Sequence, residues 1–291
     1  MRIKLMNETI ARLEDLGTRF ETSVGGRRVI WRRFGSGPDL LLLHGGHGNW
    51  LHWVSNIEQL SRSRTLWLPD MPGFGDSDTI ESGGSEEERM QLLVDSLVNS
   101  MIELRRFAVP VDVIAFSFGA FVAVRIAKCG VVRRLALVAP AGHSGRRPPR
   151  SPLAKWRGDG ALPDRQAALR FNLATLMLHD PETIDELALG IYEAQCDAAR
   201  FKVRYILRAG GLEADLRAFK GSLLLLWGEH DVTAIPQELA PQLAAGHMDA
   251  KWQIVQGAGH WVQYERPELV SSLLEDWLSN DSHTPDGLIR E

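Results

Sequence analysis

The sequence contains very little cysteine and no long apolar run. The spacing of its two cysteines, Cys129 and Cys196, matches neither a disulfide framework nor a zinc site, and two buried apolar thiols are the simpler interpretation. No window approaches the roughly 18 consecutive apolar residues of a membrane span, and the amino terminus turns polar before a signal-peptide core develops. We therefore expect a cytoplasmic protein that does not contact a membrane.

An excess of positive charge is absent as well. The 33 basic and 37 acidic residues give a net charge of −4, without the long basic stripe that a phosphate backbone requires, so we expect no nucleic acid partner. Three carboxylates, Asp70, Asp76 and Asp78, lie close together, but their spacing does not match a calcium loop and predicts structural roles in a turn. We expect neither a metal nor an organic cofactor.

The chain does contain a regular alternation of strand and helix patterns. Its 291 residues, 44% of them hydrophobic and 24% charged, suit one large α/β domain or such a domain with an inserted lobe. After a hairpin within residues 19–35, strands are expected near residues 39–43, 65–70, 111–115, 134–139, 222–227 and 251–255. This alternation predicts a mostly parallel sheet with right-handed crossovers.

The pattern changes between the sixth and seventh strands. Residues 143–211 are helical in pattern and lack strand signals, so we expect an inserted helical lobe there, with residues 1–142 and 212–291 forming the core. The lobe begins with an extended, proline-rich connection that carries Arg146, Arg147 and Arg150. A solvated hinge is the favoured interpretation of these arginines, and contact with an acidic substrate is the alternative.

One stretch, residues 111–123, reads as a strand, a sharp turn and a helix. The turn carries a single serine, Ser117, and the positions two before and two after it hold Ala115 and Gly119, which are small enough for strand and helix to meet. Such a strained turn pushes the serine hydroxyl out at the end of the sheet. The alternative is an ordinary crossing in which Ser117 caps the helix.

Two further strands end in the residues that a serine nucleophile needs. Asp231 follows one of them and His260 follows the last, so Ser117, Asp231 and His260 all come after the carboxyl ends of strands that a parallel sheet brings to one edge. A serine hydroxyl needs an adjacent base, which His260 supplies, and the imidazolium that forms needs an ionised carboxylate, which Asp231 supplies. This constellation predicts nucleophilic catalysis.

Together these segments resemble the α/β-hydrolase fold superfamily. The resemblance covers about residues 20–278 and rests on His44-Gly45-Gly46, Asp70 to Ser77, Ala115 to Gly119, Trp227 to Asp231, and Gly259-His260-Trp261. It implies an α/β fold with a mostly parallel eight-stranded sheet flanked by helices, and places the lobe where the family has its cap. It also implies the backbone N–H groups of Gly46 and Phe118 as the oxyanion hole, and Asp231 rather than Glu229 as the acid.

The substrate is less defined than the triad. Dehalogenases and epoxide hydrolases of this fold place aspartate at the nucleophile, so Ser117 indicates an acyl-type electrophile. Candidate pocket residues are His44, Gly45, Trp50, Trp53, Phe116, Trp156, Gln195 and Trp261, although such aromatic residues are as often core as pocket. We expect a hydrolase that acts through an acyl-enzyme on a carboxylic ester of a small or medium apolar acid.

Two other functions remain open. The segment from Gly259 to Gln263 is similar to the meta-cleavage-product hydrolases, which cut carbon–carbon bonds, but that family has asparagine where this chain has Phe116 and a cap arginine where an ungapped comparison gives Gln195. Arg200 and Arg204, expected on the same helix as Gln195, are possible substitutes. A ligand sensor that keeps the triad is the third option. The expected partner is a small-molecule substrate, and a homodimer is an option.

Overall fold

The computed structural model describes residues 2–80, 84–104, 109–158 and 164–279. They contain one eight-stranded sheet in the order β1-β2-β4-β3-β5-β6-β7-β8. The strands are β1 (Thr18–Val24), β2 (Arg27–Phe34), β3 (Asp39–Leu43), β4 (Thr65–Asp70), β5 (Val111–Phe116), β6 (Val132–Val138), β7 (Ser222–Gly228) and β8 (Ala250–Val255). Strand β2 is antiparallel to both β1 and β4, and the other neighbours are parallel. The predicted mostly parallel sheet is confirmed.

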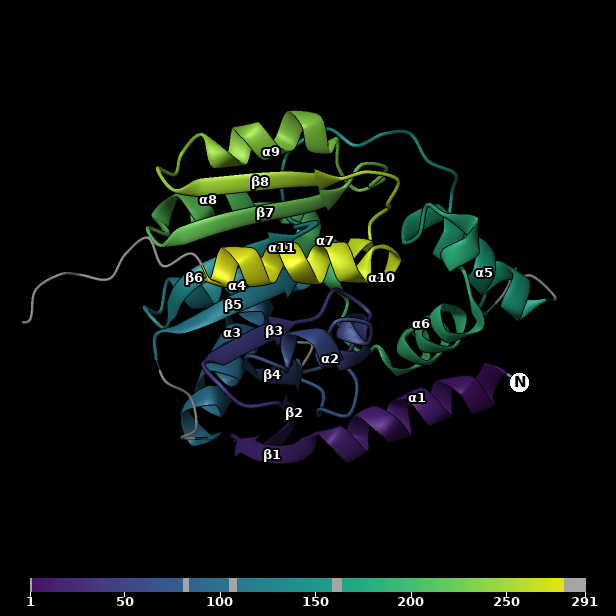
Figure 1. Ribbon diagram of the computed structural model, residues 1–291, viewed down its shortest axis with the longest axis horizontal. Coiled ribbons are helices and arrows are strands. Elements are labelled where there is room, and N and C mark those ends of the chain that lie inside the picture. The colour runs from purple at the N-terminus through teal and green to yellow at the C-terminus, as the bar shows by residue number, and fades with distance from the viewer. Residues whose placement is uncertain (1, 81–83, 105–108, 159–163, 280–291) are drawn as a thin grey trace, which may run out of the picture.

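The middle strands are apolar along their whole length because both faces of the sheet are covered. Strands β4 and β5 are buried at every residue, and β3 and β7 at every residue after the first. Helix α11 (Pro267–Ser279) crosses in front of the sheet beside α2 (Ile57–Leu60), and α3 (Glu86–Leu104) lies behind it (Figure 1). Helix α4 (Phe118–Ala127) packs on α3, β5 and β6, and α9 (Pro236–Ala244) packs on β7 and β8.

A reciprocal pair of hydrogen bonds stabilises the start of α3. The backbone N–H of Glu88 donates to the Ser85 hydroxyl, and the Glu88 carboxylate accepts from the Ser85 backbone N–H, as in a capping box. The helical sequence pattern continues to about Phe107, which lies outside the described residues. Helix α1 (Arg2–Leu16) precedes β1.

The predicted helical insertion follows the sixth strand. Helices α5 (Arg165–Leu176), α6 (Glu186–Ala198) and α7 (Val203–Ala209), with a short 3₁₀ turn, η2 (Pro181–Thr183), lie within the predicted residues 143–211. Helix α8 (Leu212–Ala218) follows before β7 and packs on α4 of the core. Figure 1 shows α5 and α6 beyond the arrowheads of β7 and β8, at the carboxyl edge of the sheet. Helix α1 packs against α6, where an added Cβ at Gly190 would lie 3.0 Å from the Met6 sulfur.

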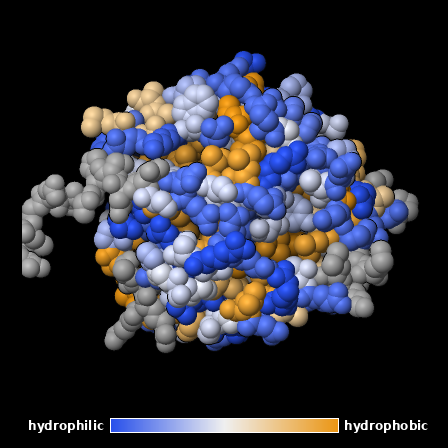
Figure 2. Space-filling model, viewed as in Figure 1, coloured by the Kyte–Doolittle hydropathy of each residue, from blue (hydrophilic) through white to orange (hydrophobic). Residues whose placement is uncertain are grey.

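Hydrophilic side chains cover most of the face seen in Figure 2, interrupted by patches of apolar ones. No helix in the four described ranges is both long and apolar enough to cross a membrane.

Candidate active site

The backbone of Ser117 is strained in the way the elbow prediction requires. Its φ of 52° and ψ of −114° lie in a region that a non-glycine residue rarely adopts, between the last residue of β5 and the first of α4. Gly119 must be small, because a Cβ there would lie 2.4 Å from the backbone oxygen of His44. The Ser117 side chain makes no capping hydrogen bond, so the helix-cap alternative is wrong. The strain instead presents the hydroxyl at the carboxyl edge of the sheet.

The structure brings Ser117, His260 and Asp231 together from the ends of three strands. The Ser117 Oγ lies 3.0 Å from His260 Nε2, and His260 Nδ1 lies 2.9 Å from Asp231 Oδ2. The Asp231 carboxylate is fully buried and the His260 side chain is only 5% exposed. This arrangement lets the imidazole accept a proton from the hydroxyl while the buried carboxylate stabilises the resulting imidazolium.

Neighbouring groups fix which carboxylate faces the imidazole. The Thr233 backbone N–H donates to Asp231 Oδ1 at 2.7 Å, and the Thr233 hydroxyl lies 3.2 Å from His260 Nδ1. Glu229, the competing acid, instead accepts from the Gly257 backbone N–H and lies 3.4 Å from His230. Thr233 was not singled out by its sequence, although it lies two residues after Asp231.

The two predicted oxyanion-hole donors are available. Within the described part of the chain, neither the Gly46 nor the Phe118 backbone N–H donates a hydrogen bond. By contrast, the Gly45 N–H donates to the His52 side chain, and the Gly48 N–H donates to the Gly45 oxygen. Phe118 is the first residue of α4, so its N–H lies at the positive end of the helix dipole. An oxyanion beside Ser117 would find preorganised donors there.

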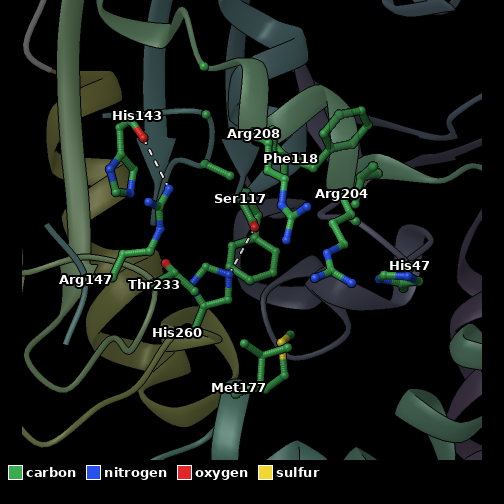
Figure 3. A pocket seen from close by; sticks show the side chains of 18 of the residues that line it. His47, Ser117, Phe118, His143, Arg147, Met177, Arg204, Arg208, Thr233 and His260 are labelled. Atoms are coloured by element: carbon green, nitrogen blue, oxygen red, sulfur yellow. Dashed lines mark hydrogen bonds between the residues drawn. The ribbon is translucent and has the colours of Figure 1, made fainter. Parts of the chain in front are cut away.

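A cavity of about 1000 Å³ opens over Ser117 and His260, between the sheet edge and the inserted helices. Phe116, Phe118, Met177, Val203 and Leu207 contribute to its apolar lining. Figure 3 shows the Ser117 and His260 side chains facing each other inside it, joined by their hydrogen bond. Such a volume suits a small or medium-sized organic substrate.

Three of the eight predicted pocket residues line a cavity. Phe116 lines the large cavity, and Trp156 and Gln195 line a smaller adjoining one of about 210 Å³. The structure places the other five, His44, Gly45, Trp50, Trp53 and Trp261, outside the lining of both, and all five are buried.

Core contacts explain this placement. The Trp53 and Trp261 indole N–H groups donate to the backbone oxygens of Leu43 and His52, so both rings serve to pack the sheet edge. Trp50 stacks on Phe34. His44 accepts a hydrogen bond from the Met71 backbone N–H, and complete burial lowers its pKa to about 4, so it is a neutral structural histidine.

The arginines of the insertion are arranged differently from the prediction. Arg200 lies between α6 and α7, not on the helix of Gln195, and its guanidinium donates to the backbone oxygens of Gly75 and Ser77. Arg204 lies on α7 and lines the cavity. Gln195 donates to the Asn49 side chain at 2.9 Å.

The predicted pocket residues include no arginine, yet several arginines line the cavity. Arg147, Arg150 and Arg208 line the cavity, whereas Arg146 binds Glu238 at the surface. Two sequence features pointed to this lining. Contact with an acidic substrate was the alternative interpretation of the arginines in residues 146–150, and Arg204 and Arg208 are spaced four residues apart on a short helix.

The carboxylate-rich loop after β4 has the structural role expected of it. Asp70 accepts from the Trp50 and Asp76 backbone N–H groups and from the Arg32 guanidinium, and Asp78 binds Arg28. Across the described ranges, no three or more His, Cys, Asp and Glu side chains gather in a way that would hold a metal ion.

Comparison with known proteins agrees with this geometry. A model of the "Alpha/beta hydrolase family" matches residues 40–273, so the chain belongs to that family. It is 28% identical to the 2-hydroxymuconate semialdehyde hydrolase of Pseudomonas sp. (strain CF600), over 89% of this chain and 93% of that protein. It is 24% identical to epoxide hydrolase 2 of Caenorhabditis elegans, over 87% of this chain and 77% of that protein.

Solved structures give the same fold. A bacterial membrane phospholipase A superposes with a TM-score of 0.76 and 20% identity, covering 95% of this chain and 91% of that one. The naproxen esterase (carboxylesterase NP) of Bacillus subtilis gives a TM-score of 0.74 with 18% identity, covering 94% and 97%. The chain is therefore a hydrolase of the alpha/beta fold, with relatives of several reaction types.

Proposed function

We propose that this alpha/beta hydrolase is a serine hydrolase that cleaves carboxylic esters of small to medium acids. The observation that carries the proposal is the continuous hydrogen-bonded series from Ser117 through His260 to Asp231, which opens onto a cavity beside two unused N–H donors. Each part of ester hydrolysis has a group suitably placed for it.

In the proposed mechanism, the Ser117 oxygen attacks the ester carbonyl carbon while its proton passes to His260 Nε2. The carbonyl oxygen becomes an oxyanion that accepts hydrogen bonds from the Gly46 and Phe118 N–H groups. The alcohol leaves with the proton held by His260, and an acyl-enzyme remains. Water then attacks the acyl group by the same route, with His260 as base, and releases the acid and the serine.

The residue before the nucleophile favours an ester over a carbon–carbon bond. The meta-cleavage-product hydrolases, which this chain resembles around His260, carry asparagine before their serine and an arginine in the cap. Here the apolar Phe116 and the neutral Gln195 stand at those positions, and Gln195 is engaged by Asn49. Phe116 cannot make the hydrogen bonds of that asparagine, and of the two possible substitutes for the cap arginine, Arg204 lines the large cavity and Arg200 does not.

Carbon–carbon hydrolysis is the second candidate. The relative from Pseudomonas sp. (strain CF600) bears the name of a semialdehyde hydrolase and aligns with nine-tenths of this chain. The mechanism would use the same serine and histidine. A ligand sensor with negligible turnover is the candidate from another class of function. The cytoplasmic location of the protein and its assembly as a homodimer also remain predictions.

The test is hydrolysis of p-nitrophenyl esters from acetate to decanoate. We expect turnover with an optimum in acyl length and a loss of at least about a hundredfold in Ser117→Ala. Cys129→Ser, which changes an exposed thiol remote from the triad, is the matched control for nucleophile replacement. Rates that Ser117→Ala leaves unchanged would overturn the proposal.

Dienone substrates then separate the two enzymatic candidates. Cleavage of a vinylogous diketone faster than of any ester would move the assignment to carbon–carbon hydrolysis. Saturable ligand binding without turnover of either class would instead support the sensor.

A further inference from the structure

Among the described residues that line the large cavity, arginine is the only type that is always charged. Arg147 and Arg150 come from the connection after β6, and Arg204 and Arg208 come from α7, while no aspartate or glutamate is part of the lining formed by the described residues. In Figure 3, the Arg204 and Arg208 side chains extend from α7 into the cavity near Ser117, and Arg147 lies on the other side near His143. The described wall of the cavity over the nucleophile therefore carries a net positive charge.

Carboxylates near the cavity are already engaged elsewhere. Glu213 accepts from the backbone N–H and hydroxyl of Ser144, and Asp215 pairs with Arg125 and Lys128. In the part of the chain that the structure describes, Arg204 and Arg208 make no hydrogen bond or ion pair. Neither Glu213 nor Asp215 therefore provides a counter-charge for these two guanidinium groups.

Other arginines of the insertion behave differently. Arg157 and Arg165 both pair with Asp197, and Arg170 reaches Glu186. Arg204 and Arg208, by contrast, lie four residues apart on one helix, where like charges weaken the helix. Their guanidinium forks match the geometry of a carboxylate or phosphate.

We propose that Arg204 and Arg208 bind a second, anionic group of the substrate, a carboxylate or phosphate that is separate from the ester group. This inference rests on the proposed function and names the substrate class of the same site. The apolar side chains of the same lining, among them Leu153, Leu176 and Met177, would contact the carbon chain of the substrate. The substrate is then an ester that also carries an anionic group.

The position of the arginines limits the size of the effect. Arg204 and Arg208 are exposed at the cavity wall, so water competes with the anion and each pair contributes only a few-fold in binding. We expect the loss of both arginines to weaken binding of the anionic substrate by about tenfold. The preference should shrink as salt rises, because exposed charges are screened.

The experiment compares the mono-p-nitrophenyl ester of suberic acid with p-nitrophenyl octanoate, which has the same chain length and no charge. A third ester, of 8-phosphonooxyoctanoic acid, distinguishes phosphate from carboxylate. We expect a higher kcat/KM for one of the anionic esters. In R204Q/R208Q that advantage should disappear through a rise in KM for the anionic ester, so that its kcat/KM no longer exceeds that of octanoate. Arg146→Gln, which removes a surface arginine paired with Glu238, should change neither.

The outcomes separate the two proposals. Hydrolysis of octanoate that depends on Ser117, without any preference for an anionic ester, would overturn the arginine site and leave the esterase standing. An equal loss for all three esters in R204Q/R208Q would do the same. Should no ester be hydrolysed, calorimetric binding of monomethyl suberate, which carries one carboxylate, and of uncharged methyl octanoate to Ser117→Ala decides. Tighter binding of monomethyl suberate that adding R204Q/R208Q abolishes supports the site, and equal binding of the two esters overturns it.

Discussion

The Glu265 carboxylate accepts a hydrogen bond from the backbone N–H of Gly259, the residue that precedes His260. Its other oxygen accepts from the backbone N–H groups of His179 and Asp180, in the segment that joins α5 to α6. Glu265 is only 4% exposed. One buried side chain therefore hydrogen-bonds both to the loop of the proposed base and to the inserted helices. The position of His260 consequently depends on how the insertion packs against the sheet.

Glu265→Gln is expected to disturb both ends of this connection. The amide NH₂ would face N–H donors in place of an acceptor, and the unpaired buried groups should lower the free energy of unfolding by about 2–4 kcal/mol. A displaced His260 should lower kcat with a smaller change in KM. Urea denaturation and ester kinetics measure the two effects. Glu268→Gln, on the exposed side of α11, is the control, and equal behaviour of both variants would contradict the coupling.

The identity of the proposed acid can be decided by a matched pair. Asp231→Asn should lower kcat by about 10⁴-fold, because the amide favours the wrong imidazole tautomer and carries no charge. Glu229→Gln should leave kcat nearly unchanged, since Glu229 bonds to Gly257 and not to His260. Thr233→Val should fall between them, with a few-fold loss from the missing hydroxyl contact. A large effect of Glu229→Gln alone would reverse the assignment.

Sequence patterns located Ser117, Asp231 and His260 because the rule behind them is topological. Parallel strands bring their carboxyl ends to one edge, so a residue that directly follows a strand is placed by the strand itself. The elbow likewise follows from local sterics, since Gly119 meets the His44 oxygen whatever the rest of the chain does. These features needed only the order of strands and the size of side chains.

The cavity wall could not be predicted in the same way. Aromatic residues such as Trp53 and Trp261 fill cores and pockets equally well, and which they do depends on packing between distant segments. The insertion has no sheet to fix its register. The break between Ala198 and Val203 turns α7 away from α6, so Gln195 and Arg204 line different cavities although nine positions separate them.

Gly46→Ala should narrow the cavity and affect esters with long acyl chains more than those with short ones. An added Cβ would lie 3.1 Å from a methyl group of Val203 on α7 and 3.6 Å from the Phe118 Cβ, so the insertion must shift slightly. We expect a stability loss of about 1 kcal/mol and a ratio of decanoate to acetate kcat/KM that falls about tenfold. Gly246→Ala, whose Cβ meets only Arg217 at 3.8 Å, is the control. An unchanged ratio would show that α7 does not bound the acyl site.

Stability should fall on acidification because of the buried His44. Burial lowers its pKa from 6.5 to about 4, so below about pH 6.5 the unfolded chain binds a proton that the folded chain does not. This stabilisation is lost as the pH falls from about 6.5 to 4, and amounts to about 2 kcal/mol between pH 7.5 and 5. His44→Gln should be less stable at pH 7.5, where the Met71 N–H loses its partner, but should lose less stability on acidification. Urea midpoints at both pH values test this, and equal losses in the two proteins would place the acid sensitivity elsewhere, first at His52, whose pKa burial also lowers.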